Sequence, residues 1–299
     1  MATRIGDLAQ NQRLTASLLA TQARLRAAQT AASSGKVASR YAEIADAAGE
    51  LVRVKDTRAL KATMAEQSER LTQRLQVMDG ALGAVTDIAD SARVALVQRL
   101  DGGLGGDVPL DAAVDTMLAE LESALNTQLD GQYLFAGTRT DTPAVALPAS
   151  PITTADPSLY YRGDDVRLTA RADADLEIGY GVTAGEGAFA DLIAALGQAR
   201  AAHLADDRAG LQAAMTNLTT ALDGVGDLRA RLGTAGARLE KVAEGHRSTV
   251  VYLDDLVSGI EDADLATLMT RIAADQTSLE AGYTIAGRLS RLSLADYLR

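Results

Sequence analysis

The chain has 299 residues and a formal net charge of −11, and it contains neither cysteine nor tryptophan. The lack of cysteine excludes disulfides, thiolate metal sites and thiol nucleophiles. Aromatic residues make up only 3% of the chain, which argues against a deep ligand pocket because aromatic side chains usually line one. An acidic chain without a dense basic patch is also not expected to bind nucleic acid. No stretch approaches 18 consecutive apolar residues, so no membrane-spanning helix is expected.

The prolines divide the chain into two arms and a middle segment. Four of the five lie between Pro143 and Pro157, and the fifth is Pro109. Proline inside a helix costs about 3 kcal/mol or more, so both long arms lack the strongest helix breaker. We predict a mainly α fold with a small β-rich insertion, in which the N- and C-terminal arms form a long antiparallel coiled-coil helical rod.

The N-terminal arm is predicted to contain a helix over residues 5–32, ended by the stop signal Ser33-Ser34-Gly35. Residues 41–57 are expected to form an ordered connector that is helical in part, and residues 58–100 a second helix. A glycine-rich turn at 101–107 precedes a shorter helix at 109–130. Small and apolar residues of the first helix alternate four and three apart, as in a coiled-coil seam: Leu14, Leu18, Thr21, Leu25, Ala28 and Ala32.

Residues 131–185 have a different character, with strand-like composition at 133–135, 166–170 and 176–178 and turn residues at 162–165 and 180–181. The C-terminal arm begins with a short helix at 188–203. A helix of about 50 residues follows from 207, with unbroken four-and-three spacing from Leu211 to Ile260. A final helix at 263–288 has Leu268, Ile272 and Leu279 as its seam.

Three domains follow from these boundaries. Residues 1–40 and 263–299 are predicted to form terminal helices that make an inner assembly domain. Residues 41–130 and 186–262 form a helical domain, and residues 131–185 form a β-rich outer head. Heptads in one arm can pack on those of the other, which makes the two ends of the chain neighbours.

Polar side chains with catalytic potential are sparse. His203 and His246 are isolated, and without cysteine they do not make a metal site. The pairs Asp164-Asp165 and Asp254-Asp255 could serve as cation ligands or acid–base groups, but turn and helix-surface carboxylates are far more common. We therefore expect no catalytic residues, no cofactor, no metal and no enzymatic activity.

Five segments together resemble the bacterial flagellin family, and most closely its hook–filament junction members. The likeness covers both arms, about two-thirds of the chain. One departure follows Lys36, where the family usually has a short acidic, proline-containing segment and this chain has Val37–Ile44. The segments that carry the resemblance are Arg4-Ile5-Gly6, Ser34-Gly35-Lys36, Gly131–Gly137 with Thr140–Pro143, Ile260–Leu265, and Leu292–Leu298.

The resemblance implies a structural subunit of the bacterial flagellum that joins a hook-side junction protein to the flagellin filament. Its implied partners are that junction protein, flagellin, an export chaperone, and copies of itself in a ring or short helical layer, with neither nucleic acid nor membrane. It also implies an extracellular location, reached by type III export without a cleaved signal peptide. The polar N-terminus is compatible with this, since it lacks a signal peptide's apolar core.

The assembly interface is predicted at the two ends of the chain. Residues 1–40 carry net charge +5 and residues 260–299 net charge −2, and these opposite signs favour pairing of terminal helices. Two alternatives stay open: a filament flagellin with a small outer domain, and a non-flagellar coiled-coil adaptor or helical enzyme. The candidate interface residues are Arg4, Ile5, Leu8, Leu14, Leu18, Leu25, Leu289, Leu292, Leu294, Tyr297 and Leu298.

Overall fold

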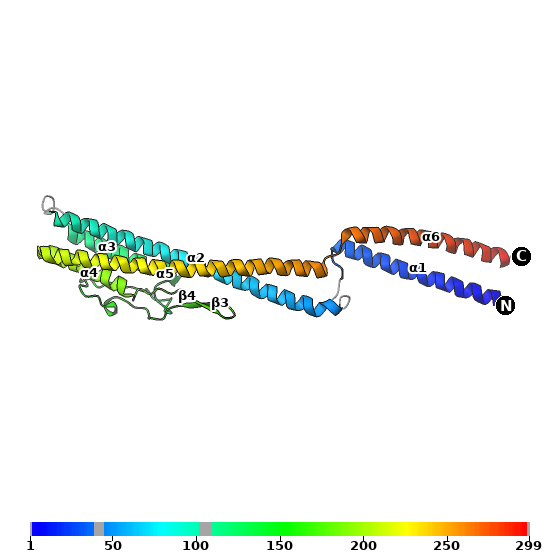
Figure 1. The fold of residues 1–299 in the computed structure, drawn as a ribbon, viewed down its shortest axis with the longest axis horizontal. Helices are drawn as coiled ribbons and strands as arrows, with labels where there is room; N and C mark the ends of the chain where they lie inside the picture. Colours follow the sequence, from blue (N-terminus) through cyan, green and yellow to red (C-terminus); the bar gives the residue numbers. More distant parts are fainter. Residues whose placement is uncertain (1, 39–44, 102–108, 298–299) are drawn as a thin grey trace. The chain divides into compact units, whose positions relative to one another are not determined.

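A computed structural model describes residues 2–38, 45–101 and 109–297 of the chain, and it gives side chains for residue 10 and for residues 12–38, 47–101 and 109–288. Six α-helices account for most of this described part, together with two small antiparallel sheets (Figure 1). None of the described helices combines the length and apolar character needed to cross a membrane. The prediction of a mainly α fold with a small β-rich insertion is confirmed.

The helices agree closely with the sequence pattern. α1 is Ala2–Ser34, α3 is Leu110–Leu125 and α4 is Gly187–Leu204. α5 runs without interruption over Arg208–Glu261, so its several glycines do not break it. α2 spans Ala45–Leu100, which places most of the predicted connector inside a helix, and α6 spans Leu265–Tyr297, beyond its predicted end at 288. The predicted glycine turn at 101–107 lies largely outside the described residues.

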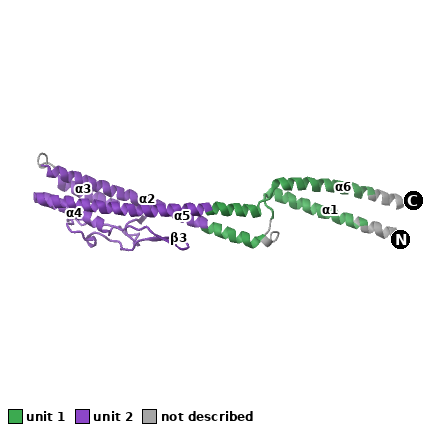
Figure 2. Ribbon diagram, viewed as in Figure 1, with its two compact units in different colours: residues 1–60, 249–299 green, residues 61–248 purple. Residues whose placement is uncertain are grey.

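The chain divides into two compact units (Figure 2). Unit 1 comprises residues 1–60 and 249–299, and unit 2 comprises residues 61–248. α2 and α5 each contribute residues to both units. The units are described separately below.

Unit 2 is built on antiparallel α2 and α5, which exchange ion pairs between Asp79 and Arg229 at 3.0 Å and between Glu69 and Arg247 at 2.5 Å. The four-and-three heptad positions of both helices are buried or half-buried in this unit, and Leu82 of α2 and Val225 of α5 are fully buried. α4 packs beside α3 and is buried on nearly every side. A helix that is apolar all round is a core helix, and α4 fills that role in unit 2.

The segment between α3 and α4 belongs to the same core. β1 (Gln128–Leu129) and β2 (Gln132–Tyr133) form one hairpin, and β3 (Thr169–Asp173) and β4 (Leu176–Gly179) form another, joined at Ala174-Asp175. Phe135 meets Phe189 of α4 edge to face, with ring centroids 6.5 Å apart. The hydroxyl of buried Tyr160 donates to the Ala184 carbonyl at 3.0 Å, and burial raises the pKa of that hydroxyl.

The strand predictions were partly wrong. The predicted strand at 133–135 ends at Tyr133, because Phe135 turns into the core instead of pairing along a sheet edge. The predicted strand at 166–170 is shifted toward the C-terminus and becomes β3. Only the strand predicted at 176–178 lies where it was expected, inside β4. Tertiary packing against α4 overrides local strand propensity here.

A polar anchor, Asp164, holds this irregular segment. Asp164 accepts from the Thr138 backbone N–H at 3.1 Å and from the Val166 N–H at 3.1 Å, and the Thr138 hydroxyl also donates to it. These hydrogen bonds lower the pKa of Asp164, the Thr138 hydroxyl contributing most. Gly137 lies beside Asp164 with φ +68°, a left-handed conformation that favours glycine. Asp164 is therefore a turn anchor, as the sequence suggested.

The β3–β4 hairpin is tied to both long helices within unit 2. Buried His246 of α5 lies with Nε2 2.9 Å from the Ala172 carbonyl, so this nitrogen donates. Lys61 of α2 donates to Asp173 at 2.9 Å. His203, the other histidine, accepts at Nδ1 from Arg99 at 2.9 Å. Both histidines serve packing and hydrogen bonding in these contacts.

Candidate assembly site at the terminal helices

α1 and α6 of unit 1 lie side by side and antiparallel, with both chain ends at the same end of the pair (Figure 1). Most of the described positions of α1 that are at least half-buried repeat four and three apart, and all six residues predicted for its seam are among them. α6 shows the same spacing, including Leu268, Ile272 and Leu279. The terminal pair is therefore a short two-helix coiled coil, as the heptads predicted.

Close packing fixes how the two helices face each other. Gly282 of α6 is buried, and a Cβ placed on it would lie 2.4 Å from Cδ2 of Leu18. Leu18 thus fills the space that a side chain at 282 would occupy. Along the same pair, the side-chain amide of Gln22 donates to the Tyr283 hydroxyl. Both contacts belong to one antiparallel register.

A polar layer interrupts the seam one to two turns from Leu18. Asp275 of α6 is buried, with 9% of its surface exposed. Arg24 of α1 approaches the Asp275 Oδ1 atom at 3.4 Å and donates from the same nitrogen to the Thr21 hydroxyl at 3.0 Å. Thr21 in turn donates to the Ser17 carbonyl at 3.0 Å. The sequence reading passed over Asp275 because it is charged, although its spacing from Ile272 and Leu279 marks it as a seam position.

At the base of the terminal pair, α1 ends beside the turn from α5 to α6. Gly35 takes a left-handed φ of +69° and ends α1 as a helix cap. The Val37 N–H donates to the Glu261 carbonyl at 2.7 Å, and the Ala263 N–H donates to the Gly35 carbonyl at 2.9 Å. Two of the family-like segments noted in the sequence, Ser34–Lys36 and Ile260–Leu265, therefore meet backbone to backbone.

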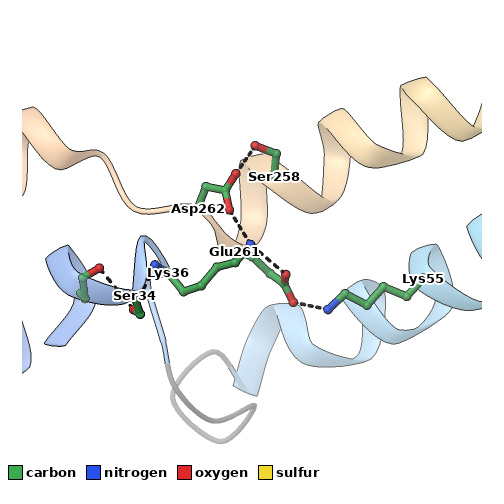
Figure 3. Close-up of polar contacts among 7 residues, drawn as sticks. Ser34, Lys36, Lys55, Ser258, Glu261 and Asp262 are labelled. Carbon is green, nitrogen blue, oxygen red and sulfur yellow. Dashed lines mark hydrogen bonds and ion pairs between the residues drawn. The ribbon is translucent and has the colours of Figure 1, made fainter.

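Side chains reinforce this meeting point, which we call the clamp and define as residues 34–37, 55, 258 and 261–264 (Figure 3). Lys36 donates to Asp262 at 2.6 Å and to Glu261 at 3.4 Å, and Lys55 of α2 donates to the other oxygen of Glu261. Ser258 donates to Asp262 at 2.5 Å. Figure 3 shows Lys36 approaching both carboxylates from the segment that follows α1, and Lys55 approaching Glu261 from α2.

These contacts favour the ionised carboxylates. The hydrogen bond from Lys36 holds the pKa of Asp262 below its ordinary value of 3.8, and Ser258 lowers it further. Lys55 lowers the pKa of Glu261 in the same way, with a smaller contribution from Lys36. Asp264 accepts from the backbone N–H groups of Ala266 and Thr267 and caps the start of α6. The clamp therefore orders both helix ends by charge-assisted hydrogen bonds.

Unit 1 leaves many large apolar side chains in contact with solvent. Most of the exposed large apolar side chains among the described residues belong to this unit, although it is the smaller one. Where such side chains form a contiguous patch, they mark a protein–protein contact site. The residues concerned are Leu19, Val37, Val52, Leu60, Val251, Tyr252, Leu256, Leu265, Met269, Tyr283 and Ile285.

The predicted interface residues divide into two sets. Leu14, Leu18 and Leu25 lie half-buried on the seam of α1, so each still exposes part of its surface. Arg4, Ile5 and Leu8 belong to α1, and Leu289, Leu292, Leu294 and Tyr297 to α6, but their side chains lie outside the described part of the structure, as does Leu298 entirely. Their role in assembly stays a prediction.

The histidine and acidic side chains of the described residues were compared with the requirements of a metal or acid–base site. Among them no group of three or more histidine or acidic side chains could hold a metal ion. Asp254 is paired with Arg58 at 2.6 Å, and Asp164 anchors a turn. The sequence did not identify Lys55 and Ser258 of the clamp, or the pair Arg24 and Asp275. Except for Ser258, these residues contact partners more than two hundred residues away, so only the folded chain brings them together.

Comparison with known proteins identifies the class. The model of the bacterial flagellin N-terminal helical region matches residues 5–140, and that of the bacterial flagellin C-terminal helical region matches residues 215–298. Together they cover well over half of the chain. The chain belongs to the bacterial flagellin family and is a structural protein of the flagellum.

Solved structures share the fold. A chain from Vibrio parahaemolyticus described as a flagellar hook-associated protein is 17% identical, with a TM-score of 0.53, covering 74% of this chain and 100% of that one. FlgL of Bacillus cereus is 18% identical, with a TM-score of 0.50, covering 66% of this chain and 99% of that one. No match was found among the curated proteins.

Proposed function

We propose that this protein is the flagellar subunit that joins a hook-side junction protein to the flagellin filament, without enzymatic activity. The observation that carries the proposal is the contrast inside unit 1, where helices with half-buried seams also expose apolar side chains. Such surface is buried when copies associate, at about 25 cal/mol per Å² of apolar area. Similarity in fold to hook-associated proteins supports the junction over the filament body.

The proposal includes partners and location. Copies of this chain would form a ring or short helical layer, with the hook-side junction protein on one side and flagellin on the other, and a chaperone would hold the chain before export. The protein would reach the flagellum through the flagellar type III export channel without a cleaved signal peptide. Leu14, Leu18 and Leu25 with the C-terminal residues 289–298 would make the inner contacts between copies.

Deletion of the gene tests this proposal directly. Electron microscopy of the deletion strain is expected to show bare hooks, and the medium is expected to contain unpolymerised flagellin, because filament subunits are exported but have nothing to attach to. Bare hooks without released flagellin would instead identify a filament subunit. Normal filaments in a strain without a second copy of the gene would contradict any flagellar junction role.

A further inference from the structure

One arginine of unit 2 is half-buried without a carboxylate beside it. Arg74 of α2 has its Nε and Nη2 atoms buried, and neither atom has a hydrogen-bond partner among the described residues. Its Nη1 atom has one long contact, to the side-chain oxygen of Gln132 in β2 at 3.4 Å. Buried N–H groups without acceptors cost stability, because they have lost water and nothing in the protein replaces it.

A comparable arginine of the same unit has an acidic partner. Arg200 of α4 also has a buried Nε atom, but a carboxylate oxygen of Asp115 lies 2.9 Å from it. No ion pair between described residues includes Arg74, although Asp130 lies in the turn of the hairpin that carries Gln132. The charge of Arg74 is therefore not neutralised within the described part of the chain.

A second unpaired arginine lies one helical turn away. Arg70 is exposed and precedes Arg74 by four residues on α2, so the two side chains are neighbours on the helix surface. No ion pair between described residues includes Arg70 either, and like charges at this spacing destabilise a helix. The chain has 40 acidic side chains and a net charge of −11, so acidic residues are not scarce. The pair of arginines is explained by a carboxylate that comes from outside the chain.

We propose that Arg74, with Arg70 beside it, is a carboxylate-binding site that is filled by an acidic side chain from a second copy of this chain. The neutral amide of Gln132 lies at Nη1, where a carboxylate would bind. A carboxylate in its place would accept charge-assisted hydrogen bonds from Nη1 and Nη2, in the bidentate geometry that a guanidinium favours.

The middle of the second copy supplies the carboxylate. Residues 101–200 carry 16 acidic and 5 basic side chains. Exposed members of this set, such as Asp175 and Glu177, form no ion pair with the described residues of their own chain. The inference rests on the proposed layer of copies, because in a ring or helix one surface of a subunit meets a different surface of the next.

Unfolding of the purified full-length chain tests whether Arg74 is unpaired. Arg74→Met keeps the length of the side chain and removes its charge, so it should raise the thermal midpoint of unit 2 by about 2–4 °C. Substitution of an arginine that holds the fold would lower the midpoint instead. Arg238→Met, at an exposed position of α5, is the matched control and should leave the midpoint unchanged. Asp130→Asn should also leave it unchanged, because Asp130 is not the partner.

Cross-linking in isolated flagella identifies the carboxylate. A carbodiimide joins a lysine to a carboxylate in contact with it as an amide, with loss of water, whereas arginine does not react. The chain has only four lysines, so Arg74→Lys adds one reactive group at the site. Flagella with this variant should give a cross-linked dimer that is absent from the original strain and from Arg238→Lys. Mass spectrometry should place the new link on an acidic residue of 101–200 in the other copy.

The two experiments separate this inference from the proposed function. The inference is overturned if Arg74→Met lowers the midpoint, if Arg74→Lys gives no new dimer, or if the added lysine links within its own chain or to a different protein. In each of these cases the chain is still present in the isolated flagella. Absence of the original chain from them would contradict the proposed function itself, and with it the second copy as the source of the carboxylate.

Discussion

Unit 2 and unit 1 differ in how far they bury their apolar side chains. The large apolar cluster of the described residues lies wholly in unit 2, from Leu75 to Leu239, and combines helices with the β hairpins. In unit 1 the fully buried apolar residues are few, and the α1–α6 seam is mostly half-buried. A unit that completes its core within one chain folds independently of neighbours, whereas one that does not gains stability from association. The difference divides the molecule into a folded body and a unit to which the proposed function gives the role of assembly element.

The largest expected effect comes from damage to the assembly element. Leu18→Asp puts a charge over Gly282, and removal of residues 290–299 shortens α6. Either change should abolish assembly into flagella, because it disturbs the α1–α6 pair that is proposed to make the contacts between copies. Motility assays and electron microscopy check this.

The helical core should survive both changes. Far-UV circular dichroism of the purified variants is expected to keep the signal that α2–α5 contribute, and the thermal transition of unit 2 should not move. Loss of helix over residues 50–260 in either variant would mean that the two units are not separable in this way.

Leucine-to-alanine substitutions in the two units sharpen the comparison. Leu82→Ala, at a fully buried site of unit 2, should lower the free energy of unfolding by about 2–5 kcal/mol, since it removes packed methyl groups and leaves a cavity. Leu25→Ala, on the half-buried seam of unit 1, should cost no more than about 1 kcal/mol. Urea unfolding of both variants measures the difference. Equal losses would contradict a division into complete and incomplete cores.

Gly137→Ala examines how unit 2 holds its irregular segment. A Cβ at 137 would lie 2.4 Å from the Asp164 backbone oxygen, and φ is +68° there. We expect a loss of about 1–3 kcal/mol from the strained backbone and the displaced Asp164 turn. Gly179→Ala is a matched control, because nothing lies within 4 Å of its added carbon and its φ is not positive. The thermal transitions of the two variants should differ clearly.

The smallest effect concerns the clamp of unit 1 and its pH dependence. The pKa values of Asp262 and Glu261 are lowered in the folded chain from ordinary values of 3.8 and 4.5. Their contribution is therefore fully present above those values and is lost as the pH falls below them and the carboxylates are protonated. The protection of residues 261–264 against hydrogen exchange, measured relative to the intrinsic exchange rate at each pH, should therefore fall in this acid range.

Lys36→Gln provides the control for the clamp. It removes the main hydrogen bond that lowers the pKa of Asp262, so the acid-induced change in exchange should shrink even though the protein is otherwise intact. The ion pairs are exposed and screened by solvent, so the overall melting temperature should hardly change. An unchanged pH profile in Lys36→Gln would show that the clamp carboxylates do not control this segment.

Much of the helical architecture could be predicted because its cause is local and periodic. The heptads of Leu14–Ala32 and Leu211–Ile260 place small and apolar residues on one face, and the scarcity of proline leaves both arms free to be helical. The strands were harder, because Phe135 gains more from burial against Phe189 of α4 than from pairing along a strand. Their final conformation depends on residues distant in sequence.

The sequence by itself determined the helices, their seams, the clustering of four prolines in the middle segment and the likeness to flagellins. The tertiary structure alone brought Lys36 to Asp262, Lys55 to Glu261 and Arg24 to Asp275, each pair separated by more than two hundred residues. Hydrophobic period is a property of a single segment, so it can be read along the chain. An ion pair depends on the register between two segments, and packing decides that register only when the chain folds.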